Sequence, residues 1–110
     1  MIATAQGLHV APGIRGYVVD LATATREHPS LSLGMSPRAS LALQRAARAR
    51  AASLGRDFVM PDDVKELARP VLEHRLALSA EAEMAGVVVG EVLSEVLGSV
   101  PVPAGRLAAG

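Results

Sequence analysis

The sequence contains no cysteine and no tryptophan, only one tyrosine and one phenylalanine, and its formal net charge is zero. The lack of cysteine excludes a disulfide framework and thiolate chemistry. A chain without excess charge has no overall field that would attract nucleic acid or an anionic membrane. Half of the residues are hydrophobic, and most of these are alanine, leucine and valine. This composition, poor in the residues typical of strands, indicates packed helices.

Several signals of location and chemistry are also absent. The longest apolar run, AGVVVG, is too short to span a bilayer, and the first ten residues do not resemble a signal peptide. We therefore expect no membrane association and a cytoplasmic location. The only lysine, Lys65, does not follow a glycine-rich run, so the chain has no phosphate-binding loop. The three histidines lack the spacing of metal ligands, and we expect no metal site.

Apolar periodicity and helix-end signals predict four helices. The first begins near residues 11–13 and runs out near 26–30, the second covers 37–54, the third begins at Pro61, and the fourth covers about 84–97. Pro70 should kink the third helix or divide it into two short helices that meet near Arg69. The segment 30–34 is expected to be a loop, and DFV and RLALSA are only weak strand candidates. The predicted fold is all-α, a small four-helix bundle with short extended links and an irregular C-terminal tail.

The second helix begins with Ser36-Pro37-Arg38. Ser36 suits the N-cap position and Pro37 the first helical position. Arg38 then places a positive charge at the positive end of the helix dipole, at a cost of about 0.3–1 kcal/mol. A bound anion would offset this cost, because Arg38 and the free N–H groups of the helix start would both face it. The alternative is a salt bridge to an acid such as Asp20 or Glu27.

Residues 9–79, which include YVVDLATATREHPSLSLGMSPRASLALQRAARARAASLGRDFVMPDDV, closely resemble the C-terminal lid of MoxR-family AAA+ ATPases. VPVP at residues 100–103 resembles the usual ending of this family. Each motif alone is weak, but their order and spacing together are specific. The motifs are Tyr17–Leu21, Thr25-Arg26, Gly34–Ala39, Gly55-Arg56-Asp57, Pro61–Val64 and His74-Arg75-Leu76.

The resemblance implies a helical lid in residues 11–99, preceded by a link (1–10) from an ATPase core that is absent from this chain and followed by a tail (100–110). It implies that Arg38 is a sensor-2 arginine, which reaches the terminal phosphates of ATP. Ser36, Tyr17 and Ile14 are weaker candidates for nucleotide contact. For Tyr17, a place in the core is at least as well supported as contact with the adenine base.

The resemblance also implies cofactors and partners for the full-length parent protein. The parent would be an ATPase that uses ATP and Mg²⁺ in a chaperone-like remodelling or maturation machine. This chain alone would bind no cofactor and would not be catalytically competent. The implied partners are its own ATPase core, neighbouring subunits of a ring and a von Willebrand factor A-domain protein.

The sequence departs from the family pattern at two positions. Met35 stands where a small residue is more usual, so the loop before the second helix is expected to pack differently. Met60 replaces the usual threonine before Pro61, which removes a hydroxyl N-cap and costs about 1 kcal/mol.

Two other function classes fit parts of the sequence. GRDFVMPDDV also resembles the start of the last helix in histone folds, which would make the chain a module for binding DNA or protein. Arg45, Arg48 and Arg50 form a candidate basic strip, but neutral charge and scarce aromatics favour a solvated helix face over nucleic-acid contact. The third interpretation is a helical adaptor without a nucleotide, in which Arg38 is held in an internal salt bridge.

Overall fold

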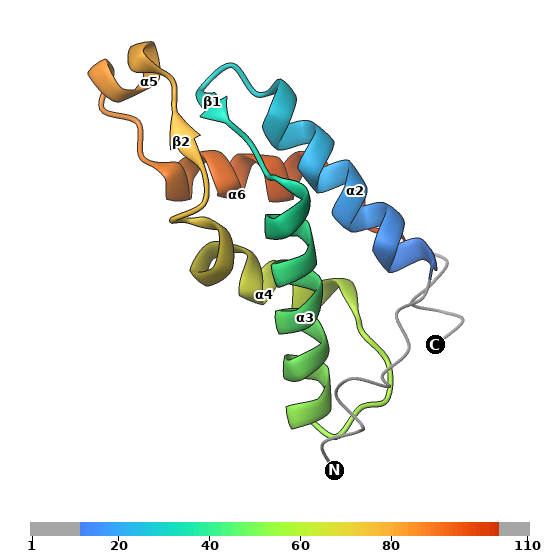
Figure 1. Cartoon of the computed structure of the whole chain (residues 1–110). Helices are drawn as coiled ribbons and strands as arrows, with labels where there is room; N and C mark the ends of the chain where they lie inside the picture. The colour runs from blue at the N-terminus through green and yellow to red at the C-terminus, as the bar shows by residue number, and fades with distance from the viewer. Residues whose placement is uncertain (1–11, 104–110) are drawn as a thin grey trace.

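The computed structural model describes residues 12–103. The predicted N-terminal link and residues 104–110 of the predicted tail lie outside the described residues. Within residues 12–103 the chain forms five helices and a two-stranded sheet (Figure 1). The elements are α2 (Pro12–Glu27), β1 (Leu31–Leu33), α3 (Pro37–Ser53), α4 (Pro61–Leu72), β2 (Ala77–Leu78), α5 (Ala80–Met84) and α6 (Val89–Ser99).

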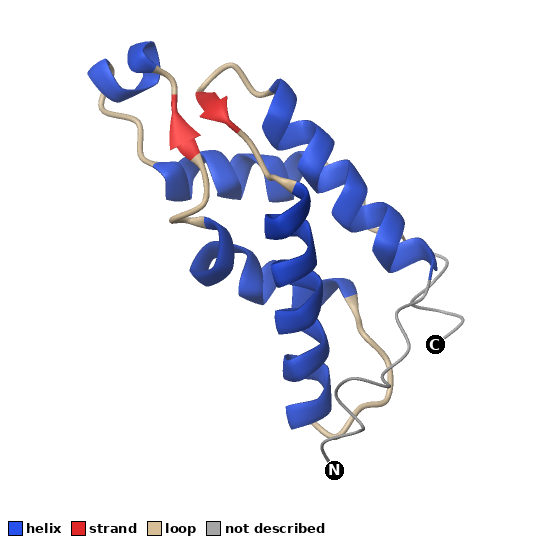
Figure 2. Ribbon diagram, in the orientation of Figure 1, coloured by secondary structure: helices blue, strands red, loops and turns tan. Residues whose placement is uncertain are grey.

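The four longer helices share one hydrophobic core. Helices α3 and α4 pack against each other most extensively, and α2 and α6 contact each other and complete the core. Tyr17, Leu43, Leu72 and Leu93 come from one helix each and are at most 2% exposed. The predicted class is therefore confirmed, because helices dominate the structure and the strands form only a small feature at one end (Figure 2). Burial of these large side chains is the main source of stability.

The short sheet is a correction, because neither of its two strands was predicted. Strand β1 lies in a segment expected to be a loop, and β2 lies in RLALSA, which was only a weak candidate. The strands are antiparallel, with Leu31 opposite Leu78 and Leu33 opposite Ala77. Ser32 Oγ also donates a hydrogen bond to the Leu78 carbonyl oxygen at 3.0 Å. Strands of two and three residues are too short to show an alternating pattern in the sequence.

Helix α4 runs as one helix through Pro70, so the alternative of two short helices is wrong, and a kink at Pro70 stays a prediction. Pro70 lies close to the C-terminal end of the helix, where few backbone bonds remain to be lost. The ladder resumes directly after it, because the Glu73 N–H donates to the Arg69 carbonyl oxygen at 3.0 Å.

The predicted fourth helix corresponds to α6, which starts later than expected, and the short helix α5 before it was not predicted, which is a second correction. Ser79 caps α5 by accepting a hydrogen bond from the Ala82 N–H at 3.2 Å. Gly86 then takes φ of +82°, a left-handed conformation that ends the short helix. Helix α6 therefore begins at Val89 rather than near residue 84.

The described part of the tail is irregular, as predicted, and lies against the bundle. Val100 and Val102 are partly buried and pack against the core, and residues 101–103 form neither helix nor strand. Across residues 12–103, no helix has both the length and the apolar character that crossing a bilayer requires.

Candidate functional site

The start of α3 has the geometry that the sequence predicts. Ser36 has extended backbone angles (φ −78°, ψ 165°), and its Oγ accepts a hydrogen bond from the Ala39 N–H at 3.0 Å. Pro37 occupies the first helical turn. Serine and proline thus set the position of the first turn, from which the Arg38 side chain extends.

The loop before α3 is fastened to α2 by two consecutive residues. Thr25 Oγ1 accepts a hydrogen bond from the Met35 N–H at 2.9 Å and donates one to the Ala22 carbonyl oxygen at 2.8 Å. Arg26 Nε donates to the Met35 carbonyl oxygen at 2.9 Å. Arg26 is therefore more than the ordinary surface charge that its place on a helix suggests. Both backbone groups of Met35 are held by α2, which fixes the residue directly before the N-cap.

Gly34 allows this close approach of the loop to α2. A Cβ atom at this position would lie 2.7 Å from the Arg26 backbone nitrogen and 2.8 Å from Arg26 Cα. No side chain fits such a contact with backbone atoms. Met35, which stands where the family pattern more often has a small residue, is 1% exposed and fills part of the core.

The Arg38 side chain is exposed, and within residues 12–103 it makes no hydrogen bond and no ion pair. Asp20 and Glu27, the acids considered as salt-bridge partners, do not pair with it. The interpretation of an adaptor in which an internal salt bridge holds Arg38 therefore lacks its expected contact. The guanidinium stands at the first turn of α3, beside the start of a helix whose N–H groups favour an anion.

Tyr17 and Ile14, the weaker candidates for nucleotide contact, lie in the core and are 1% and 2% exposed. The Tyr17 hydroxyl is buried and has no hydrogen-bond partner among residues 12–103. Burial raises the pKa of this hydroxyl, and the charge of Asp62 raises it further. Contact of either side chain with a base stays a prediction. Ser36 Oγ is already engaged in capping.

A second polar centre, which the sequence did not reveal, joins the end of α3 to the start of α4. The Asp63 carboxylate is fully buried and accepts three hydrogen bonds from arginines. Arg50 Nη1 donates at 2.5 Å, and Arg56 donates through Nη1 at 2.8 Å and Nη2 at 2.7 Å. Arg50 therefore does not belong to an exposed basic strip with Arg45 and Arg48, which corrects that part of the sequence interpretation.

Asp63 also supplies the reciprocal half of a capping box at the start of α4, although the side-chain cap that Met60 cannot provide stays missing. Its Oδ2 accepts a hydrogen bond from the Met60 N–H at 2.7 Å. Burial alone would raise the pKa of Asp63, but the hydrogen bonds from Arg56, Met60 and Arg50 outweigh burial and lower it. Asp63 therefore remains ionised in the folded chain. The signal in the sequence was its position three residues after the N-cap, where an acid can reach back to the cap.

The model of the AAA lid domain family matches residues 23–96, which is more than half of the chain. The chain belongs to the AAA lid domain family. The matched residues include the clamp on Met35, which is the pair of bonds from Thr25 and Arg26, and the Ser36-Pro37-Arg38 turn. They also include the Asp63 centre, which is Asp63 with Arg50 and Arg56. The match also covers GRDFVMPDDV, so this segment is part of an AAA lid and does not support a histone fold.

Known relatives of this AAA lid confirm the resemblance to the MoxR type. The chain is 41% identical to the uncharacterized protein YeaC of Bacillus subtilis, with 94% of the chain and 32% of YeaC covered. It is 37% identical to protein MoxR of Paracoccus denitrificans, covering 89% of the chain and 33% of that protein. It is 40% identical to chaperone MoxR1 of Mycobacterium tuberculosis, covering 79% of the chain and 26% of that protein.

A solved structure supports the same assignment. The crystal structure of a candidate ATPase from Cytophaga hutchinsonii matches 91% of the AAA lid chain with a TM-score of 0.85 and 30% identity. The matched region is 33% of that protein. The AAA lid thus spans about a quarter to a third of the length of the relatives that it matches.

Proposed function

We propose that this AAA lid closes over ATP bound by the core domain of a MoxR-type ATPase, and that Arg38 acts as the sensor-2 arginine. The observation that carries the proposal is the state of Arg38. Its guanidinium is exposed at a fixed helix start and has no partner within residues 12–103. The Met35 clamp supports this role, because it holds the turn that presents the guanidinium.

The chemistry of this turn suits a phosphate group. Arginine is planar, stays charged and can bind two phosphate oxygens at once. The start of α3 adds its backbone dipole to the same region. When ATP is bound, it supplies the phosphoryl group and its charge, and Arg38 would bind and orient the terminal oxygens. Mg²⁺ would be held by the core domain, as the family resemblance implies.

The wider role of the parent protein follows from the same proposal. Lid movement on loss of the terminal phosphate would act on neighbouring subunits of a ring. A remodelling function fits the name of the M. tuberculosis relative, which is a chaperone. A von Willebrand factor A-domain partner and a cytoplasmic location stay predictions from the sequence.

Arg38→Ala in the full-length protein tests the proposal. We expect ATP turnover to fall by at least about tenfold, as for other groups that stabilise charge on the transferred phosphoryl group. Arg38→Lys should restore only part of the rate, because an ammonium group cannot make the paired contact. Arg75→Ala removes an exposed arginine elsewhere on the chain and should leave turnover unchanged. Full turnover by Arg38→Ala would exclude Arg38 from the mechanism.

A further inference from the structure

Arg26 is the exposed member of the clamp on Met35. It lies in the last turn of α2, and its side chain crosses to the loop before α3, nine residues further along the chain. Thr25, the other member, is 1% exposed, and its hydroxyl makes two bonds inside the core. A buried hydroxyl must be bonded for the chain to fold well, but an exposed arginine can leave its charged end in water at little cost. Folding alone therefore explains the bond from Thr25 better than it explains the bond from Arg26.

Arg26 makes this bond through Nε, the guanidinium nitrogen nearest the backbone. Nε donates to the Met35 carbonyl oxygen at 2.9 Å. The two outer nitrogens, Nη1 and Nη2, have no hydrogen-bond or ion-pair partner within residues 12–103. The contact thus depends on one N–H group, and the described part of the chain does not pair the positive charge of Arg26.

The two bonds of the clamp hold two consecutive peptide groups. The Met35 N–H belongs to the peptide group that follows Gly34, and the Met35 carbonyl belongs to the one that enters Ser36. Because a peptide group is planar, a bond to one of its atoms restricts the orientation of the whole group. Thr25 holds the first group and Arg26 the second. Arg26 therefore fixes the peptide group directly before the N-cap.

The first turn of α3, which carries Arg38, lies between this bond and the hydrophobic core. Ala39 is the first buried residue of α3 and is 0% exposed, so the core fixes the helix from that residue onward. The bond from the Ala39 N–H to Ser36 Oγ shapes the turn internally. Within residues 12–103, the hydrogen bonds that join this turn and the residue before it to another helix are those of the clamp. The placement of Arg38 therefore depends on Met35 at one end and on Ala39 at the other.

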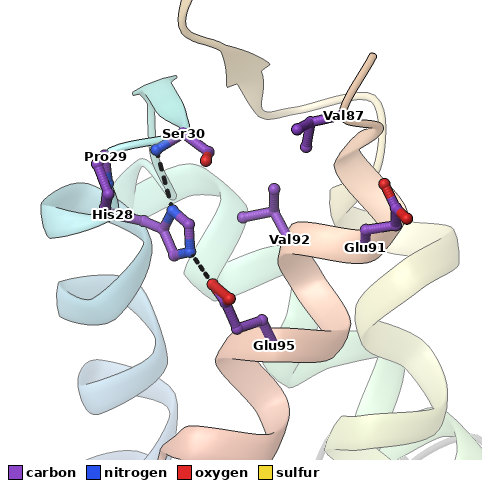
Figure 3. Close-up of a pocket in the computed structure, with 7 residues that line it drawn as sticks. All are labelled: His28, Pro29, Ser30, Val87, Glu91, Val92 and Glu95. Atoms are coloured by element: carbon purple, nitrogen blue, oxygen red, sulfur yellow. Dashed lines mark hydrogen bonds and ion pairs between the residues drawn. The ribbon is translucent and has the colours of Figure 1, made fainter. Parts of the chain in front are cut away.

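The end of α2 that carries Arg26 is itself anchored. His28 Nδ1 accepts a hydrogen bond from the Ser30 N–H at 3.0 Å, within the turn that follows α2 (Figure 3). His28 Nε2 contacts Glu95 on α6, as Figure 3 also shows. The Arg26 side chain therefore reaches Met35 from a base that is tied to a second helix.

We propose that Arg26 is a positioning residue for Arg38. Through its Nε bond it fixes the peptide group that enters Ser36, and this keeps the Arg38 guanidinium where the terminal phosphates of ATP would lie. A group that stabilises a reacting centre must be placed accurately, and a displacement of about 1 Å lowers a rate by as much as about a hundredfold. The inference rests on the proposed function, because it assigns a second residue to the same site.

Direct contact of Arg26 with a phosphate is the alternative role, since its Nη groups are free among the described residues. The helix dipoles argue against it. Arg26 lies in the last turn of α2, where the dipole already stabilises a cation, whereas Arg38 lies in a first turn, where the dipole opposes one. An anion would therefore relieve an unfavourable charge at Arg38 but not at Arg26.

Two substitutions of Arg26 separate the Nε bond from the charge. Glutamine carries an NH₂ group at the position of arginine Nε, so Arg26→Gln keeps a donor for Met35 and loses the charge. Methionine has no donor, so Arg26→Met loses both. In the full-length ATPase, Arg26→Met should lower kcat by roughly three- to tenfold, and Arg26→Gln should stay within about twofold of the original. Arg75→Met, a matched change at an exposed arginine elsewhere on the chain, should leave kcat unchanged.

A double variant shows whether Arg26 acts through Arg38. In the Arg38→Ala background, Arg26→Met should have little further effect, because the group that it positions is absent. A loss that came from poorer folding would instead lower kcat by the same factor in both backgrounds.

The outcomes for Arg26 and Arg38 are distinguishable. Equal losses in both backgrounds, or an Arg26→Gln variant as slow as Arg26→Met, would overturn the positioning role. If Arg38→Ala slows turnover and Arg26→Met does not, the role of Arg26 is wrong while the proposed function stands. Full turnover by Arg38→Ala would refute both.

Discussion

Replacement of Asp63 by asparagine would test how strongly one buried carboxylate holds α3 and α4 of this AAA lid together. The carboxylate is fully buried and links the last turn of α3, the following loop and the first turn of α4. Asparagine has nearly the same shape but carries no charge. The change therefore removes the ion pairs to Arg50 and Arg56 without leaving a cavity.

The expected loss follows from the exposure of the partners. Removal of one partner from a buried ion pair costs about 3–5 kcal/mol when the remaining charge stays buried. Here the side chains of Arg50 and Arg56 are 29% and 22% exposed, so water can partly solvate them after the change. We therefore expect Asp63→Asn to lower the free energy of unfolding by about 2–3 kcal/mol. For a chain of this size the urea midpoint should fall by roughly 2 M.

The dependence on pH distinguishes the ion pairs from general packing. The pKa of Asp63 is lower in the folded chain than the ordinary value of 3.8, so its carboxylate adds stability above that pH. This contribution is lost as the pH falls through the lowered pKa. The difference between the original chain and Asp63→Asn should be constant near neutral pH and shrink in strong acid.

Urea unfolding followed by circular dichroism, at neutral pH and at a series of acidic values, measures both effects. Asp62→Asn is the matched control, because Asp62 occupies the same first turn of α4 but is exposed. It should cost only about 0.3–1 kcal/mol, through the helix dipole. If Asp63→Asn cost no more than Asp62→Asn, or if its cost did not change in acid, the Asp63 centre would not stabilise the fold as argued.

The clamp on the loop before α3 gives two further expected outcomes. Gly34→Ala should destabilise the fold by more than about 2 kcal/mol, because its Cβ would meet backbone atoms of α2 that cannot move aside. Thermal unfolding measures this loss, and Gly16→Ala, whose Cβ would meet open space, should be neutral or stabilising in the same assay. Equal melting temperatures for Gly34→Ala and the original chain would contradict this explanation. Thr25→Val leaves the Met35 N–H without its acceptor and should cost about 1–3 kcal/mol in urea unfolding. A cost below about 0.5 kcal/mol would show that this bond adds little.

The start of α3 was predictable because its signals are local. The hydroxyl of Ser36 and the fixed φ of Pro37 act within one turn, and the structure has both in the expected roles. The apolar positions of the longer helices also follow from spacing alone, since they define which face is buried. Family membership was predictable for a different reason, because it depends on the order of several motifs.

The contacts between distant segments were not predictable in this way. β1 and β2 are separated by two helices, and each is too short to give an alternating pattern. Arg50 has the same sequence surroundings as Arg45 and Arg48, but only Arg50 faces a buried acid on α4. The sequence showed which residues carry charge, whereas their pairing depends on how α3 and α4 pack.

The two ends of α3 show why the exposed charge of Arg38 is informative. Arg50 lies in the last turn, where the helix dipole favours a cation and Asp63 neutralises it. Arg38 lies in the first turn, where the dipole opposes it and where it has no partner within residues 12–103. Ser36 and the clamp on Met35 fix the backbone of this turn, and therefore the position from which the exposed Arg38 side chain extends. An anion at this position would be stabilised by both the guanidinium and the helix start.

A ligand can shift a conformational equilibrium only by interacting differently with its two states, and a charge unpaired until the ligand arrives provides such a difference. Since the turn is bonded to α2, a phosphate held by Arg38 would act on the packed lid as a whole rather than on a single loop.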